Sequence, residues 1–298
     1  RVGPEEPTPT APETVSTEPE LLARHFAEAG IADAAIAYWL KASKRSISRS
    51  AYREALAHIG AGDEQLQRLP AGRDRSLLEL QLQLQRGAGL QAIKGMSAPE
   101  TGAAFAAARE LSNQLGGDIR EGLPALFGVY IFHTARGEHR LALEVAKEAL
   151  LRAQQVDEPA LRVLAHRMMG VPLHFCGELS VAVEHLEQVV RLYDFGRDRE
   201  SALVYGTDSK AASLSILSQS LFALGQSDRA LAVARQAVDH AQGIAHFHSI
   251  AHALAQLAGV HLLRREPESA LEEAKRGMDL SEQHAAGMQY EVGRALVG

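Results

Sequence analysis

The chain lacks most of what disulfide-bonded and membrane-spanning proteins need. It has one cysteine, one tryptophan and 5% aromatic residues among 298. A single cysteine excludes an intrachain disulfide, and Cys176 stands in the apolar stretch LHFCG, which favours a buried structural thiol over a nucleophile. No apolar run approaches the roughly 20 residues that span a bilayer, and the N-terminus does not resemble a signal peptide. We therefore expect a reduced, cytoplasmic setting and no membrane contact.

The chain also lacks an excess of basic residues and lacks nucleotide-binding motifs. The net charge is −6, whereas a main role in nucleic-acid binding needs an excess of Lys and Arg. No Gly-x4-Gly-Lys-Ser/Thr string occurs, and the GxG at Gly87 and Gly89 lacks the third glycine and the preceding strand of a dinucleotide site. The paired metal-binding aspartates of a cyclase would have no strand to hold them. We expect no catalytic residue, cofactor or metal in this chain.

What the sequence does contain is a repeated turn followed by a small residue at a fixed distance. In five segments an alanine stands five residues after the turn residue, and an apolar residue stands six after it. The segments are GIADAAI (30–36), GEHRLAL (137–143), GELSVAV (177–183), GQSDRAL (225–231) and REPESAL (265–271). Small residues return seven positions later, at Ala42, Ala149, Ala237 and Gly277, with Val189 as the exception. Small side chains two helical turns apart let helices approach closely, which is typical of helix pairs stacked into a solenoid.

The composition favours helix along nearly the whole chain. Ala, Leu, Gln, Glu and Arg are abundant, and no convincing strand run occurs. We predict an all-α fold, an α-solenoid of antiparallel helix pairs at 19–298, truncated at the C-terminus and preceded by a Pro-rich linker at 1–18. The connection 194–210 is the one irregular insertion, and we expect it to project from one face and to contribute to binding. The predicted helices are 20–29, 33–49, 52–69, 74–93, 99–116, 120–136, 140–156, 160–176, 180–193, 208–224, 228–242, 247–264, 267–284 and 288 onward.

The helix pairs resemble the tetratricopeptide repeat. Gly170, Ser218 and Ala258 stand seven residues before a turn, where that repeat has a small contact residue, although Tyr130 departs from the pattern. Trp39 occupies the aromatic position of the repeat. The turns at 137, 177, 225 and 265 are 40, 48 and 40 residues apart, more than the usual period of about 34. The helices or loops are therefore expected to be longer than in the standard motif.

The resemblance narrows further in six short blocks. These are PELLARHFAEAG (19–30), AYWLKA (37–42), SAYREA (50–55), IKGMSAPE (93–100), HRMMG (166–170) and YGTD (205–208). Together they resemble the C-terminal helical region of large bacterial proteins in which a class III adenylate/guanylate cyclase is fused to an AAA ATPase. Related arrays occur in large ATP-binding LuxR-type regulators. The resemblance extends from about residue 12 to the end and implies cyclase and P-loop ATPase domains upstream of this chain.

The first helix of each pair lines the inner groove of such a solenoid, so we expect binding residues there. The candidate residues combine apolar, amide and basic side chains, which suit a peptide or a partner helix. For each candidate residue, the alternative is that its side chain only packs against the next repeat. The candidates are Phe127, Ile131, Arg167, Met168, His174, Ile216, Gln219, Phe222, His252 and Gln256.

Two histidines form an alternative candidate site, for a metal ion. His248 and His252 are four residues apart, so they share a helix face and are able to hold a metal together. No acidic neighbour stands beside the pair, so we favour hydrogen-bonded structural histidines. The resemblance implies that His246 begins a helix, which also favours a structural role. The charged run 197–200 is expected to be a solvated loop.

Two functions remain open. The first is a non-catalytic regulatory module that binds a protein or peptide, or the upstream domains of its own polypeptide. The second is a small-ligand (inducer) sensor of a large ATP-binding transcription regulator, which needs an enclosed pocket where the first needs an open groove.

Overall fold

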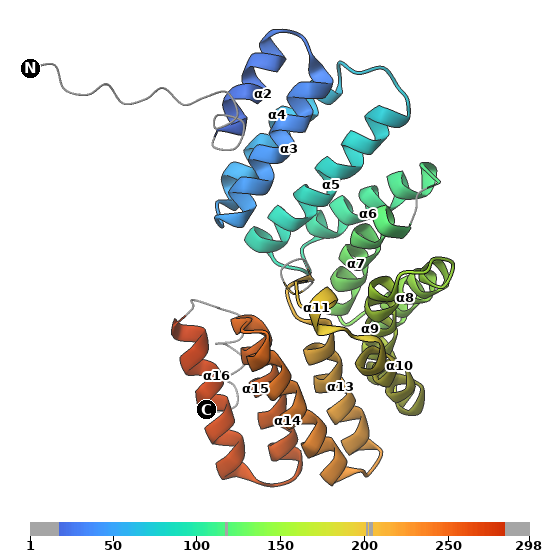
Figure 1. Ribbon diagram of the computed structural model, residues 1–298, viewed down its shortest axis with the longest axis vertical. Coiled ribbons are helices and arrows are strands. Elements are labelled where there is room, and N and C mark those ends of the chain that lie inside the picture. The colour runs from blue at the N-terminus through green and yellow to red at the C-terminus, as the bar shows by residue number, and fades with distance from the viewer. Residues whose placement is uncertain (1–17, 117–118, 201, 203–204, 284–298) are drawn as a thin grey trace, which may run out of the picture. The chain divides into compact units, whose positions relative to one another are not determined.

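The computed structural model describes residues 18–116, 119–200, 202 and 205–283, and these form fourteen helices and no strand (Figure 1). This confirms the all-α prediction. The linker predicted at 1–18 falls outside the described residues except for its last position, and the helix predicted from 288 onward falls outside them entirely.

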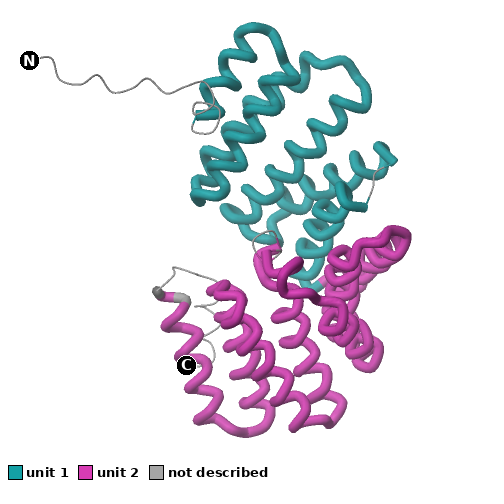
Figure 2. The backbone as a smooth tube through the Cα atoms, in the orientation of Figure 1, with its two compact units in different colours: residues 1–137 teal, residues 138–298 magenta. Residues whose placement is uncertain are grey.

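The chain divides into two compact units, residues 1–137 (unit 1) and 138–298 (unit 2), which Figure 2 colours separately. Unit 1 contains α2 (Pro19–Glu28), α3 (Ala32–Ser48), α4 (Tyr52–Leu66), α5 (Arg73–Lys94), α6 (Pro99–Gln114) and α7 (Ile119–Ala135). Unit 2 contains α8 (His139–Ala153), α9 (Pro159–Phe175), α10 (Leu179–Leu192), α11 (Phe195–Asp198), α13 (Ser209–Ala223), α14 (Ser227–Gly243), α15 (Phe247–Leu263) and α16 (Pro267–Gln283).

The repeated turn residues adopt the left-handed backbone conformation. The φ angle is +74° at Gly30, +72° at Gly137, +84° at Gly177 and +81° at Gly225. Arg265 has φ of +62° in the fifth turn, where a side chain must tolerate a conformation that favours glycine. A left-handed residue ends one helix and allows the next to begin after a short connection. The repeated sequence motif therefore marks real interhelical turns.

The small residues of the motif lie at helix contacts, as predicted. Ala142, Ala182 and Ala230 have no exposed surface. A Cβ atom on Gly170 would lie 2.5 Å from the side chain of Leu186, so α9 and α10 pack too closely for any larger residue at this point. Side-chain size at these positions thus sets the spacing of the helices.

The packing of helices repeats along unit 2. The pairs are α9 with α10, α13 with α14 and α15 with α16, and α13 also contacts both α9 and α15. We call α9, α13 and α15 the first helices of unit 2 and the layer they form its inner layer.

Unit 1 follows the same order with a different register. There α3 pairs with α4, α5 pairs with α6, and α3 contacts α5 directly. The motif at 30–36 therefore begins a first helix of unit 1, whereas the motifs at 177, 225 and 265 begin second helices. Since the motif only marks a turn between closely packed helices, it does not distinguish the two kinds.

Candidate functional site

The inner layer of unit 2 is joined by polar side chains that reach between neighbouring first helices. His174 Nδ1 on α9 lies 2.9 Å from Ser220 Oγ on α13. One helix further along, Gln219 Nε2 on α13 donates to Gln256 Oε1 on α15. The structure thus brings together three of the predicted groove residues, and all three remain partly exposed.

The other predicted groove residues separate into buried and partly exposed groups. Met168 has no exposed surface, and Ile216 and Phe127 are each 8% exposed, so packing already occupies these three side chains. Phe127 belongs to unit 1, where its ring lies 5.7 Å from that of Tyr130. The partly exposed group consists of Ile131, Phe222 and His252.

Arg167 is engaged within the chain. It is 6% exposed, and its guanidinium donates to the Thr207 carbonyl at 3.0 Å and to Thr207 Oγ1 at 2.5 Å. Ser209 Oγ lies 3.5 Å from the same guanidinium. Arg167 on α9 therefore holds the segment that leads into α13.

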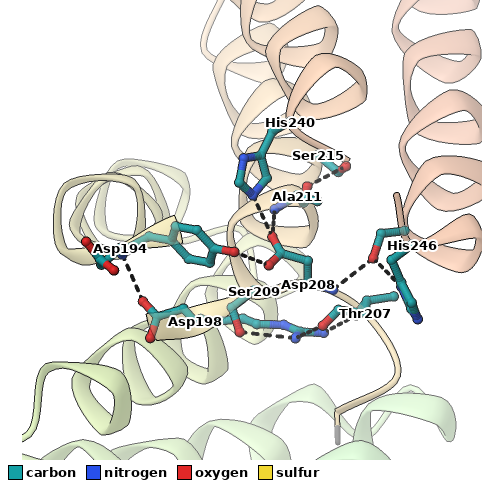
Figure 3. A network of polar contacts seen from close by, with 12 residues as sticks. Asp194, Asp198, Thr207, Asp208, Ser209, Ala211, Ser215, His240 and His246 are labelled. Carbon is teal, nitrogen blue, oxygen red and sulfur yellow. Dashed lines mark hydrogen bonds and ion pairs between the residues drawn. The ribbon is translucent and has the colours of Figure 1, made fainter. Parts of the chain in front are cut away.

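Asp208 is the centre of the polar network in Figure 3. Its carboxylate has no exposed surface and accepts hydrogen bonds from Tyr193 Oη at 2.6 Å, His240 Nε2 at 3.0 Å and the Ala211 N–H at 2.8 Å. The last of these caps the N-terminus of α13. The Asp208 N–H in turn donates to Ser249 Oγ at 2.9 Å. One aspartate thereby links the ends of α10 and α13 to α14 and α15.

The network shifts the pKa values of its own members. Burial alone would raise the pKa of Asp208, but the hydrogen bonds from His240, Tyr193 and Ala211 outweigh it and hold the pKa below its usual value. Burial, followed by the hydrogen bond to Asp208, raises the pKa of Tyr193. Asp208 is therefore ionised and Tyr193 protonated at neutral pH.

The described part of the insertion 194–210 contains the short helix α11 and is held to α9 and α14 at Thr207 and Asp208. Asp194 caps the short helix α11 through the Arg197 N–H at 2.8 Å, and its own N–H donates to Asp198 at 2.9 Å. Arg197 binds both carboxylate oxygens of Asp198, at 2.7 and 2.6 Å. Asp198 is 4% exposed, so the prediction of a solvated loop was wrong for this residue. Bidentate pairing with a neighbouring arginine offsets the cost of burying the charge.

The histidines of unit 2 have structural partners. His246 begins α15 as predicted, and its Nδ1 lies 2.9 Å from Ser249 Oγ. Burial lowers the pKa of His248 and, with help from Arg167 and His248, lowers that of His252 to about 4. Within the described part of the chain, no three His, Cys, Asp or Glu side chains gather as a metal site would require.

Sequence reasoning missed a second histidine pair. His166 Nδ1 on α9 lies 2.9 Å from His185 Nδ1 on α10, and burial together with His185, Arg162 and Arg191 lowers the pKa of His166 to about 4. A signal was present, because Gly170 marks the point where α9 meets α10 and His166 stands one turn before it. At neutral pH both rings are uncharged and able to share a hydrogen bond.

Two properties of the site follow from these contacts. The network around Asp208 and Arg167 is buried and fixes the backbone, whereas the amide and imidazole groups of His174, Gln219 and Gln256 remain available at the inner layer. Such groups are able to donate and accept hydrogen bonds. No helix among the described residues is long and apolar enough to cross a membrane.

The amino-acid sequence of this chain is similar to that of a curated bacterial protein. No family model matches the chain. It is 25% identical over 279 residues to the uncharacterized protein R02095 of Rhizobium meliloti, covering 93% of this chain but 26% of that protein. The chain thus spans about a quarter of the length of this curated relative.

Solved structures of helical-repeat proteins are similar at low sequence identity. The apo quorum sensor NprR from B. thuringiensis has a TM-score of 0.64 at 13% identity, over 89% of this chain and 70% of that one. The Rap conjugation gene regulator of plasmid pLS20, in complex with the Phr* peptide, has 0.56 at 13%, over 89% and 74%. A STAND (Signal Transduction ATPase with Numerous Domains) protein with a tetratricopeptide repeat sensor, from Pyrococcus horikoshii, has 0.56 at 13%, over 96% and 43%. The fold is that of a tetratricopeptide-like helical-repeat solenoid, as predicted.

Proposed function

We propose that this chain is a non-catalytic regulatory module whose unit 2 binds a peptide or protein segment along its inner layer. The observation that supports this most directly is the pair of polar bridges, His174 with Ser220 and Gln219 with Gln256, which join three successive first helices. Side-chain amides satisfy the N–H and C=O groups of an extended peptide, and the partly exposed Phe222 adds apolar contact.

The comparisons are consistent with this proposal. The similar Rap regulator was solved with a bound peptide, and the similar NprR is a quorum sensor. Arg167, one of the predicted groove residues, donates its guanidinium hydrogens to Thr207. In the proposed complex Arg167 therefore positions α13, and the amide pair makes the contact with the peptide.

We further propose that the module belongs to a larger signalling ATPase or nucleotide cyclase. The six sequence blocks, the 26% share of the Rhizobium protein and the 43% share of the STAND protein support this parent. In that setting the bound segment comes either from a separate partner or from an upstream domain of the same polypeptide.

A peptide-binding experiment tests the proposal. An array of randomised octapeptides selects the best binder, whose affinity is then measured by fluorescence anisotropy. The double variant Gln219→Ala/Gln256→Ala should bind about tenfold more weakly, since it loses two neutral hydrogen bonds of roughly 0.5–1.5 kcal/mol each. Gln242→Ala, an exposed glutamine on α14, is the matched control and should bind like the wild type.

Two results would contradict the proposed peptide binding. If no peptide binds saturably, or if the double variant binds as tightly as the control, unit 2 does not recognise peptides through its amide pair. If a small organic molecule instead raises the melting temperature, and raises it further as its concentration increases, the small-ligand sensor replaces the peptide module.

A further inference from the structure

Unit 1 has an open hollow of about 420 Å³ between α3 and α5. Its size lies within the range of roughly 300–1,000 Å³ that is usual for ligand sites. Lys41 and Lys44 line it from α3, and Gln81 and Gln85 line it from α5. Because α3 and α5 are first helices that contact each other, the hollow belongs to the inner layer of unit 1.

The lining forms one continuous stripe on each helix. Ala37, Leu40 and the two lysines stand at positions i, i+3, i+4 and i+7 of α3, so they share one helix face. Leu84 stands between the two glutamines of α5 in the same manner. The hollow therefore combines apolar surface with two ammonium groups and two amides.

One acceptor in the hollow lacks a donor. Among the described residues, the side-chain carbonyl Oε1 of Gln85 is buried and meets no hydrogen-bond partner. A buried acceptor without a donor is unfavourable, and a ligand N–H reaching this oxygen would relieve that cost.

The lysines give the hollow its charge preference. Lys41 Nζ lies 4.4 Å from the centre of the Tyr38 ring, a cation–π contact, and both lysine side chains are exposed. Neither forms an ion pair with an acidic group among the described residues. Two cations one turn apart favour a ligand with negative charge.

We propose that this hollow binds an acidic peptide segment. Its carboxylates meet Lys41 and Lys44, a backbone N–H donates to Gln85, and an apolar side chain packs on Leu40 and Leu84. A peptide provides a carboxylate, an amide N–H and an apolar group within neighbouring residues, which matches the three kinds of surface in the hollow. This site is separate from the amide pair of unit 2 and does not depend on it.

Anisotropy titration with a fluorescein-labelled peptide, acetyl-Glu-Leu-Glu-Leu-Glu, tests the site on the full chain. The peptide should bind saturably, and Lys41→Gln/Lys44→Gln should weaken it about tenfold, because each exposed ion pair contributes up to a few-fold. The matched control Lys147→Gln/Lys275→Gln removes the same charge from exposed lysines of unit 2 and should leave the affinity unchanged. Absence of binding, or an equal loss in the control, overturns the proposal.

Gln85→Leu separates a binding role from a structural one. The substitution removes the unmet acceptor, so the urea midpoint should stay the same or rise while peptide affinity falls about threefold to tenfold. A lower midpoint with unchanged affinity would show that Gln85 serves the fold alone and would contradict the proposed contact.

Two further arms identify the ligand and keep this proposal apart from the function of unit 2. Acetyl-Lys-Leu-Lys-Leu-Lys should not bind, and free glutarate should compete much more weakly than the acidic peptide; equal competition would assign the site to a small carboxylic acid. Gln219→Ala/Gln256→Ala should bind the acidic peptide like the wild type. A loss there would place the peptide on unit 2 instead.

Discussion

The inner layers of the two units use polar residues in opposite ways. In unit 2 the polar side chains bond one another: Arg167 holds Thr207, Asp208 collects three donors, and Gln219 meets Gln256. In unit 1 the inner layer leaves a hollow in which Gln85 has an unmet acceptor. Polar side chains thus join the first helices of unit 2, whereas a hollow lies between two first helices of unit 1.

The buried side chains of the two units also differ in type. Around α3 to α5 the core is built from Ile36, Leu40, Ile59, Leu66 and Leu82. In contrast α13 is buried over most of its surface and contains four fully buried serines, three of which donate to carbonyls of their own helix. A serine that bonds its own backbone acts as a small side chain, so neighbouring helices pack closely around it. Large apolar residues are needed where helices stand further apart.

Removing Asp208, the centre of the buried network in unit 2, is expected to have the largest effect on stability. Asp208→Ala leaves Tyr193, His240 and the end of α13 without their acceptor, and we expect a loss of roughly 3 kcal/mol in the free energy of unfolding. Urea denaturation followed by circular dichroism measures it. Asp194→Ala removes an exposed helix cap and should cost about 1 kcal/mol or less.

The tryptophan of unit 1 allows unfolding of that unit to be followed separately in this test. Trp39 is the single tryptophan and packs beside Ala35 and Ala42, so its fluorescence reports on unit 1. We expect Asp208→Ala to move the circular dichroism transition more than the fluorescence transition. An unchanged midpoint in both signals would mean that the buried network does not stabilise unit 2.

Close helix contacts are expected to be equally sensitive in both units. Ala182→Leu in unit 2 and Ala35→Leu in unit 1 should each destabilise by about 1–3 kcal/mol, because both alanines are fully buried between helices. Ala88→Leu, an exposed position on α5, is the control. Equal denaturation midpoints for all three variants and the wild type would remove these alanines from the helix contacts.

Acid is expected to weaken unit 2 through its histidines. The pKa of His166 and of His252 is about 4 in the folded chain, against about 6.5 when unfolded. Between these values the unfolded chain binds more protons, so stability falls as the pH drops from about 6.5 towards 4. Urea midpoints at pH 7 and pH 5 measure the fall. His166→Gln/His252→Gln should flatten it, and the same slope in this variant would rule out these two rings as its cause.

The helices and turns could be predicted because they depend on local sequence. The positive φ angles at Gly137, Gly177 and Gly225, and the burial of the alanines after them, follow from a motif that fits within one turn. The insertion's short helix was missed. Its local signal is Asp194, a favourable N-cap residue whose carboxylate accepts from the Arg197 N–H.

Contacts between helices could not be predicted in the same way. Apart from the helix cap at Ala211, the partners of Asp208 come from residues 193, 240 and 249, and nothing in the local sequence around any of them specifies the others. The hollow depends on how α3 and α5 are rotated towards each other. The predicted set of groove residues was mixed for this reason: helix periodicity gives a face, but packing decides which side chains of that face are buried.

Hydrogen–deuterium exchange with the array-selected octapeptide tests whether this chain recognises peptides through the inner layer of unit 2. We expect saturating peptide to slow exchange in α9, α13 and α15, and we expect this slowing to be lost in Gln219→Ala/Gln256→Ala. Slowing confined to the second helices α10, α14 and α16, or the same protection in the double variant, would contradict peptide recognition by the inner layer.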